Sequence, residues 1–235
     1  MHVLIVHAHP EPESFTGALR AVAERTLTGA GHQVTVSDLY ASGFDAAGGP
    51  GDFSRLAHEG PFRYQQEQAA ALEAGTMAPG LAEEVRRVGA ADLVILQFPL
   101  WWFGLPAILK GWVDRVFAFG FAYGPGRSHA TGPLRGKRGM LALTTGAPEA
   151  AFGTGGPNGS LEVLLHPVQY GVLHFSGMDV LPPFVAWGAA RVDDATRARY
   201  LERYRAHLEA LPEMSPLSLG PLTRPVAPVA PPAPH

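Results

Sequence analysis

Short apolar runs separated by helical patterns constrain the fold of this chain more than any other feature. Residues 3–7 form a β-branched run, and residues 92–96 are apolar as in a strand buried on both faces of a parallel sheet. Similar strand patterns cover residues 33–39, 140–143 and 178–181. Because five strands alternate with helices, the sequence predicts an α/β fold with a doubly wound, five-stranded parallel sheet.

Helical periodicity fills the intervals between these strands. Ser14 is a candidate N-cap for a helix that extends to Ala30, and Gly29 and Gly31 are candidate stops. Further helices are predicted over residues 65–74, 81–88, 161–175 and 194–211, and one starts at residue 106. Residues 41–65 are rich in Gly, Asp and Phe, which predicts a long irregular excursion.

The length of 235 residues suits one domain with an appendage. We expect the domain to cover residues 1–212. Residues 213–235 contain seven prolines and almost no charge, so this tail is predicted to be extended or disordered.

Composition excludes several classes of protein. The chain has no cysteine, which rules out disulfides, zinc thiolate sites and thiol nucleophiles. A formal charge of -3 gives no general electrostatic footprint for nucleic acid. The sequence contains no signal peptide pattern and no apolar stretch of about 18 residues, so we expect a cytoplasmic protein without a transmembrane segment.

Ligands of open parallel sheets bind beyond the carboxyl ends of the strands, and three such ends are distinctive here. The first, at residues 7–16, leads into a helix, where free N–H groups beside His9, Ser14 and Thr16 suit a phosphate. Neither the GxGxxG nor the GxxxxGK[ST] pattern occurs there. A purely structural role for Ser14 as N-cap remains an alternative.

The second end, residues 97–106, contains four aromatic side chains, three of them between Pro99 and Pro106. A planar ligand stacked on this loop explains them, and burial in a core or a dimer interface explains them equally well. The third end, residues 144–147, offers threonine hydroxyls and backbone N–H groups. Together, the three loops suit a flavin, which has a phosphate, a flat ring and a polar ring edge.

The sequence resembles the NAD(P)H quinone dehydrogenases, a flavodoxin-like family, from about residue 3 to residue 211. The resemblance rests on the run FPLWWFGLPAILKGWVDRVF, on His9, Ser14-Phe15, residues 37–40, residues 144–146, residues 167–169 and residues 173–175. It implies bound FAD rather than FMN and a homodimer with two shared active sites. It also implies a ping-pong reaction in which NADH or NADPH gives a hydride to flavin N5 and a quinone then accepts two electrons.

The resemblance also assigns site residues. It places these residues at the cofactor: His9, Ser14, Phe15, Thr16, Pro99, Leu100, Trp101, Trp102, Phe103, Thr144, Thr145, Gly146 and Arg197. For Arg197, an ordinary exposed position on the closing helix is an equal alternative. The substrate slot is assigned to Phe103, Tyr123, Phe175 and Pro125, the last in place of a family aromatic. The family's catalytic Tyr and His correspond to Phe152 and Asn158. Neither can donate a proton as an imidazolium does, although the Asn158 amide can hydrogen-bond an anionic flavin.

Three rival functions follow from the same residues. His7-Ala8-His9-Pro10-Glu11 resembles the AHPDD motif of zinc-dependent deacetylases, but Pro12 separates the two acidic residues, and no metal site is predicted. Relatives with this fold also act as flavin-binding regulatory subunits of potassium efflux systems, and the missing Tyr and His pair keeps that alternative open. A response regulator is disfavoured because His7 and Pro99, not a phosphorylatable aspartate, occupy the strand ends.

Overall fold

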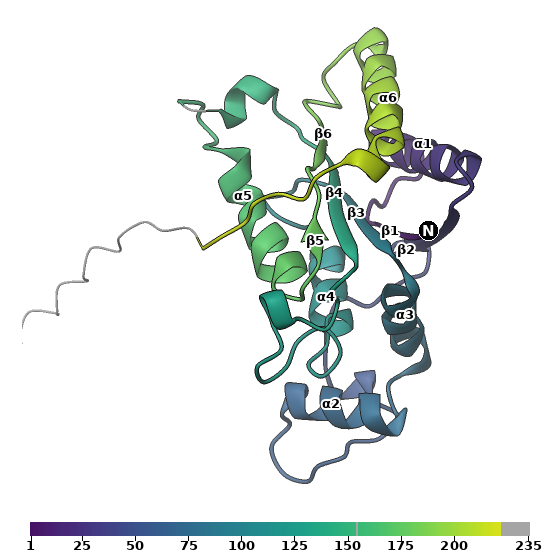
Figure 1. The fold of residues 1–235 in the computed structure, drawn as a ribbon, viewed down its shortest axis with the longest axis vertical. Helices are drawn as coiled ribbons and strands as arrows, with labels where there is room; N and C mark the ends of the chain where they lie inside the picture. Colours follow the sequence, from purple (N-terminus) through teal and green to yellow (C-terminus); the bar gives the residue numbers. More distant parts are fainter. Residues whose placement is uncertain (154, 222–235) are drawn as a thin grey trace, which may run out of the picture.

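A parallel β-sheet runs through the centre of the computed structural model, which describes residues 1–153 and 155–221. Its strands are β1 (His2–His7), β2 (Gln33–Asp38), β3 (Leu93–Pro99), β4 (Arg138–Thr144), β5 (Asp179–Val180) and β6 (Phe184–Ala186). They follow the order β2-β1-β3-β4-β5, and β6 also pairs with β4 (Figure 1). This is the order of flavodoxin-like sheets, so the predicted doubly wound fold is confirmed.

Helices cover both faces of the sheet (Figure 1). The helices are α1 (Phe15–Gly29), α2 (Tyr64–Ala74), α3 (Pro79–Ala90), α4 (Ala107–Val116), α5 (Leu161–Val168) and α6 (Asp194–Glu209). One face packs on α1 and α6, and the other packs on α3, α4 and α5. Strands β1, β3 and β4 are therefore buried on both faces, which accounts for their nearly continuous apolar sequences.

Two elements differ from the prediction because of proline residues. The helix predicted over residues 161–175 is α5 followed by a π-helical segment, Gln169–His174, because Pro167 inside α5 lacks an N–H donor. The strand predicted over residues 178–181 is reduced to β5, since Pro182 and Pro183 cannot donate to a ladder. The chain pairs with β4 again at β6, a strand that sequence analysis missed.

The irregular excursion predicted over residues 41–65 is fixed to α4. It contains a single 3₁₀ turn, Pro50–Asp52, and ends where α2 begins. Arg115 of α4 pairs with the buried carboxylate of Asp52 at 2.5 Å, and the Tyr64 hydroxyl donates to the same carboxylate. A Cβ at Gly111 would collide with the Ala46 backbone, so the close approach requires glycine there.

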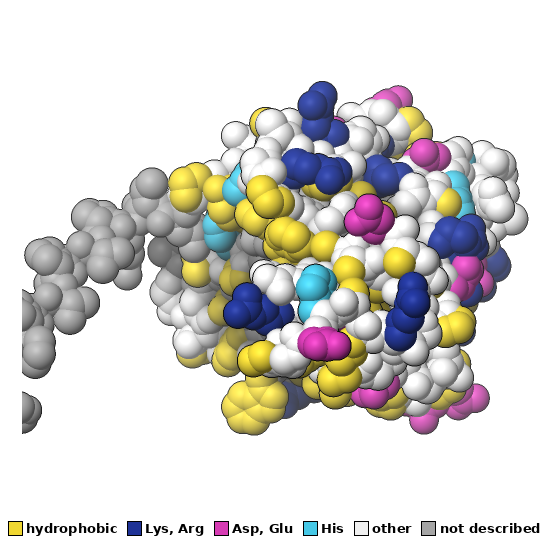
Figure 2. All heavy atoms as spheres, turned by 90° about the horizontal axis from the view of Figure 1, so that it is seen from below, with side chains coloured by type: hydrophobic (Ala, Val, Ile, Leu, Met, Phe, Trp, Pro, Cys, Tyr) yellow, Lys and Arg dark blue, Asp and Glu magenta, His cyan; other side chains and the backbone are white. Residues whose placement is uncertain are grey.

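Charges are mixed on the face at the α2 end of the molecule. In Figure 2, which views this end, Lys and Arg side chains are interspersed with Asp, Glu and hydrophobic side chains. In the part of the chain that the structure describes, no helix has the length and apolar character needed to cross a membrane.

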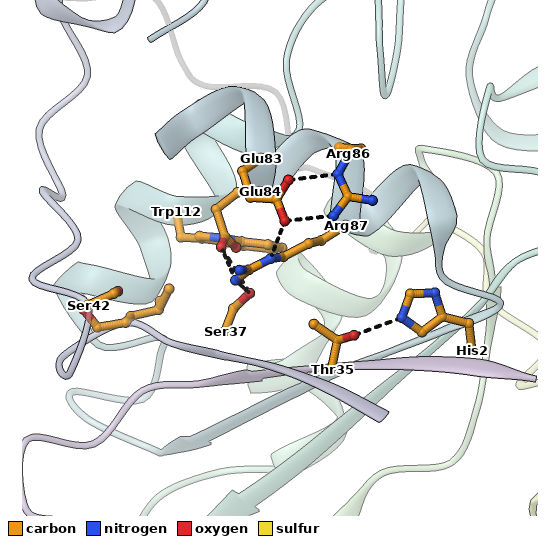
Figure 3. Close-up of polar contacts among 10 residues, drawn as sticks. His2, Thr35, Ser37, Ser42, Glu83, Glu84, Arg86, Arg87 and Trp112 are labelled. Atoms are coloured by element: carbon orange, nitrogen blue, oxygen red, sulfur yellow. Dashed lines mark hydrogen bonds and ion pairs between the residues drawn. The ribbon is translucent and has the colours of Figure 1, made fainter. Parts of the chain in front are cut away.

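A polar network holds α3 against β2 and α4 (Figure 3). The carboxylate of Glu84 accepts hydrogen bonds from the Ser37 hydroxyl at 3.0 Å, from Arg87 at 2.8 Å and from the Trp112 indole at 2.8 Å. Glu84 is buried, whereas its neighbour Glu83 pairs with Arg86 and Arg87 at the surface. Since three donors converge on Glu84, this carboxylate connects three elements of the fold.

The chain beyond α6 lies along the last strands of the sheet. The Leu217 N–H donates to the Val180 carbonyl at 2.8 Å, and Arg138 donates to the carbonyls of Leu211 and Met214. The described part of the predicted tail, residues 213–221, is thus bound against β5. Residues 222–235 lie outside the described residues.

His7 is the last residue of β1 and is buried on the α1 side of the sheet. Its Nδ1 has no hydrogen-bond partner among the described residues. Burial lowers the pKa of His7 to about 4, and the nearby carboxylate of Asp38 only partly offsets this effect. His7 is therefore neutral in the folded protein near neutral pH.

Replacing Glu84 tests the polar network. Glu84→Ala leaves the Arg87 guanidinium and the Trp112 N–H without their buried acceptor, so we expect the free energy of unfolding to fall by about 3 kcal/mol. Urea titration measures this change. The matched control, Glu83→Ala, removes only surface pairs and should cost much less. Equal losses in the two variants would contradict the assignment.

Replacing His7 tests its buried neutral state. The unfolded chain binds a proton at this imidazole below about pH 6.5 and the folded chain only below about pH 4, so His7 makes the wild type lose stability as the pH falls through this window. When the pH is lowered from 7 to 5, the free energy of unfolding should decrease in both proteins. We expect the decrease to be about 2 kcal/mol smaller in His7→Leu than in the wild type. Urea titrations at both pH values measure this difference, with His32→Leu as control.

Candidate functional site

A cavity of about 570 Å³ opens at the carboxyl ends of β1, β3 and β4. Its walls are formed by His9, Glu13, Ser14, Phe15, Thr16, Ala18, Pro99, Leu100, Trp101, Thr144, Thr145, Gly146, Ala189, Ala190 and Arg197. The parallel register explains this convergence, because β1, β3 and β4 end at the same edge of the sheet. The structure therefore brings eleven of the predicted cofactor residues around one space.

The start of α1 forms one end of the cavity and presents hydrogen-bond donors there. Ser14 caps the helix, and its hydroxyl accepts from the Gly17 N–H at 3.1 Å. The N–H groups of Phe15 and Thr16 are left without partners within the helix, so they are available to an anionic ligand. A Cβ at Gly17 would collide with the Pro12 carbonyl, which shows how closely the preceding loop packs on this first turn.

Arg197 adds a positive charge to the same cavity. Its Nε donates to the Ala189 carbonyl at 3.2 Å, and its Nη1 pairs with Asp194 at 2.8 Å. The side chain is 37% exposed, so it can reach a ligand from the solvent side. Glu13 is the acidic residue in the cavity wall and opposes this charge.

The turn after β3 is strained. Trp102 and Phe103 have φ values of 49° and 60°, and the backbone groups of Trp101 and Gly104 hydrogen-bond each other in both directions. Positive φ at both central residues is a type I′ turn, which costs bulky residues of order 1 kcal/mol each. The turn places Trp102 beside the cavity with 97% of the residue exposed. Strained backbone of this kind is common in functional loops.

The segment after β4 is fixed by the hydroxyl of Thr145. This hydroxyl donates to the Ala147 carbonyl at 2.7 Å and accepts from the Gly188 N–H at 3.1 Å. The Thr144 hydroxyl lies 3.1 Å from that of Thr16, which connects β4 to α1. Both threonines thus have fixed positions at the polar side of the cavity.

A second groove of about 270 Å³ adjoins the cavity. It is lined by Leu100, Trp102, Phe103, Thr145, Gly146, Ala147, Phe152 and Asn158. Leu100, Thr145 and Gly146 belong to both spaces. Phe152 and Asn158, which the resemblance assigned to the family's catalytic positions, are therefore next to the predicted cofactor residues. We call this second groove the front groove.

Three of the four predicted substrate residues lie away from the cavity and the front groove. Tyr123 and Phe175, whose ring centroids are 5.7 Å apart, line a separate groove of about 220 Å³ with Val113, Asp114, Phe117, Gly171, Val172 and Ser176. This groove shares no residue with the cavity or the front groove. Pro125 lies in an exposed turn closed by Gly124 and Arg127. Within one chain, these three residues are not assembled with Phe103.

Sequence analysis missed some residues of the site. Ala18, Ala189 and Ala190 carry no polar group, so only their places after a helix start or a strand end could have indicated them. Glu13 was part of the first loop but was not singled out. His7 and His9 were considered as zinc ligands; β1 ends at His7, and among the described residues no three metal-binding side chains form a cluster.

Comparison with known proteins agrees with this arrangement. Residues 1–208 match a family with the flavodoxin-like fold. NAD(P)H dehydrogenase [quinone] 1 of Cavia porcellus is 38% identical over 93% of this chain and 80% of its own length. Ribosyldihydronicotinamide dehydrogenase [quinone] of Homo sapiens is 38% identical over 92% of this chain and 94% of its own length.

A solved structure is also similar. A Klebsiella pneumoniae protein assigned as a quinone reductase superposes with a TM-score of 0.88 at 38% identity, covering 92% of this chain and 86% of its own. The matched region includes β1, β3 and β4 with the loops that form the cavity. The chain therefore belongs to the flavodoxin-like family of the NAD(P)H quinone dehydrogenases.

Proposed function

We propose that this protein is an FAD-dependent NAD(P)H:quinone oxidoreductase. The observation that supports this proposal best is the continuity between the anion-binding cavity at α1 and the apolar front groove. A ligand with phosphates at one end and a flat ring at the other matches that shape. The names of the relatives, which specify a nicotinamide donor and a quinone, point to the same chemistry.

The residues present fit a flavin. The free N–H groups of α1, the Ser14 and Thr16 hydroxyls and Arg197 would hold the diphosphate. Residues 99–103 would lie along the isoalloxazine, and Thr144, Thr145 and Gly146 would hydrogen-bond its polar edge. When bound, the flavin supplies the redox chemistry by accepting a hydride at N5 and passing two electrons to the quinone.

The chain itself orients the substrates. In the front groove, Phe103 and Phe152 offer apolar walls, so a nicotinamide and then a quinone can occupy the same place in turn. This alternation is a ping-pong reaction. Asn158 offers an amide that donates a hydrogen bond but does not transfer a proton, and Phe152 offers neither. We therefore expect protons to come from water at the open groove.

A homodimer would complete the substrate slot. Tyr123 and Phe175 line a groove separate from the front groove of their own chain, so they can face a bound substrate only if a second copy supplies them. Pro125 sits in the exposed turn next to Tyr123 and would approach the slot from the same copy. Quinone, nicotinamide and a second copy are thus the proposed partners, and a cytoplasmic location stays a prediction.

A second candidate function uses the same flavin site. A flavin-binding regulatory subunit of a potassium efflux system needs the cavity but not rapid turnover. Phe152 and Asn158 favour this alternative, since neither side chain transfers a proton. Both functions predict flavin binding, and they differ in catalytic rate.

Spectroscopy with turnover tests the proposal. We expect the purified protein to be yellow, to release FAD on denaturation, and to bleach anaerobically when a reduced nicotinamide is added. NADH, NADPH and dihydronicotinamide riboside should be compared, because relatives of equal identity carry names with different donors. Oxidation by 1,4-benzoquinone should then restore the colour.

The outcomes separate the candidates. Release of FMN would correct the cofactor. Flavin binding with negligible quinone turnover would favour the regulatory function. Colourless protein that does not take up added flavin would reject both.

Subunit mixing tests the shared slot. Tyr123→Ala/Phe175→Ala damages one face of the proposed dimer, and Phe103→Ala damages the other. Each variant alone should lose most quinone activity. After unfolding and refolding together at equal amounts, heterodimers with one intact slot should restore about a quarter of wild-type activity. Sedimentation checks that dimers form. No recovery in mixed dimers would show that both sets of residues act in the same chain or not at all.

A further inference from the structure

We infer that Trp187 is a positioning residue for the acceptor: its ring holds Phe152 in place as a wall of the front groove and so limits the size of the quinone that fits. This inference rests on the proposed function. Trp187 lies outside the front groove and was not among the predicted site residues.

Phe152 and Trp187 form the partition between two spaces. Their ring centroids are 5.3 Å apart with an angle of 39° between the planes, and Phe152 is only 7% exposed. Phe152 lines the front groove, whereas Trp187 lines a different groove of about 310 Å³, which we call the rear groove. The rear groove also contains Pro148, Glu149, Gly188, Arg191, Val192 and Tyr200. The ring pair therefore separates the two grooves.

Trp187 has a rigid support. It directly follows β6, whose last residue, Ala186, pairs with Thr144 of β4. The Trp187 carbonyl accepts from the Tyr200 hydroxyl at 3.0 Å, and the Tyr200 ring packs edge-on against Phe15 of α1. The backbone that carries the indole is thus fixed by the sheet and by α6, whereas Phe152 is carried by the loop after β4.

The loop after β4 transmits the position of Phe152 to Asn158. The backbone N–H of Asn158 donates to the carbonyl of Ala151 at 2.9 Å. Ala151 directly precedes Phe152, so the position of Asn158 is coupled to that of Phe152. A Cβ at Gly156 would come within 2.7 Å of the carbonyls of Ala150 and Ala151, which shows how tightly this loop folds back. A shift of Phe152 therefore also moves Asn158.

The consequence is a limit on acceptor shape. With the indole in place, Phe152 closes the front groove on its rear side, and the slot suits a one-ring quinone. Without the indole, Phe152 loses its backing, and the front groove can extend into the rear groove. Quinones with three fused rings would then gain a place that the wild type denies them.

Acceptor kinetics of the flavin-loaded enzyme test this inference. The measured quantity is kcat/KM for 9,10-phenanthrenequinone divided by kcat/KM for 1,4-benzoquinone. Trp187→Ala should raise this ratio about tenfold or more, mainly by raising KM for the small quinone and lowering it for the large one. Trp187→Phe, which keeps an aromatic ring behind Phe152, should stay close to the wild type. Val192→Ala, elsewhere in the rear groove, is the matched control.

A second measurement is independent of turnover. Hydrogen exchange should show that the backbone N–H of Asn158 exchanges faster in Trp187→Ala than in the wild type and in Val192→Ala. Trp187→Leu replaces Trp187→Ala if the latter does not fold. A folded Trp187 variant with an unchanged quinone ratio and unchanged Asn158 exchange overturns the inference. A wild type that binds flavin but reduces neither quinone overturns the proposed function instead, and the exchange result then decides the positioning role alone.

Discussion

Backbone hydrogen bonds hold β1, β3 and β4 in a parallel register that pairs His7 with Gln97 and Pro99 with Thr144. The site depends on this register, because it brings three loops from distant parts of the sequence to one edge of the sheet. A slip by one residue would turn every apolar side chain of a strand to the opposite face. Since β1, β3 and β4 are buried on both sides, the order of the loops is fixed together with the core.

Local signals made the fold and the cavity predictable. The apolar runs of β1 and β3 and the capping hydroxyl of Ser14 act within a few residues of their own position, and the structure shows them as the sequence indicates. The cavity then follows from topology, since strand ends of a parallel sheet must meet. What the sequence could not indicate are effects of pairing over long distances. The return of β6 to β4 after Pro182 and Pro183 is such a case.

The substrate slot was the least predictable part for the same reason. Resemblance put Phe103, Tyr123 and Phe175 in one slot, but it carries no information on which copy of the chain supplies each residue. The structure separates Phe103 from the other two. The contact between Phe152 and Trp187 was also hidden, because its partners come from different loops and neither has a polar group that marks a site.

The polar and apolar parts of the site show a division of tasks. The N–H groups at the start of α1 and the Arg197 side chain are carried by helices, and in the proposed function they would hold the charged end of the ligand. On the opposite side, Phe152 and Asn158 depend on a loop that folds back on itself and rests on Trp187. Under the proposed function, aromatic packing takes the place of a proton-donating pair, so the chain would control the shape of the slot and leave proton supply to solvent. On that proposal, the specificity of the site for its acceptor depends on how firmly Trp187 backs Phe152.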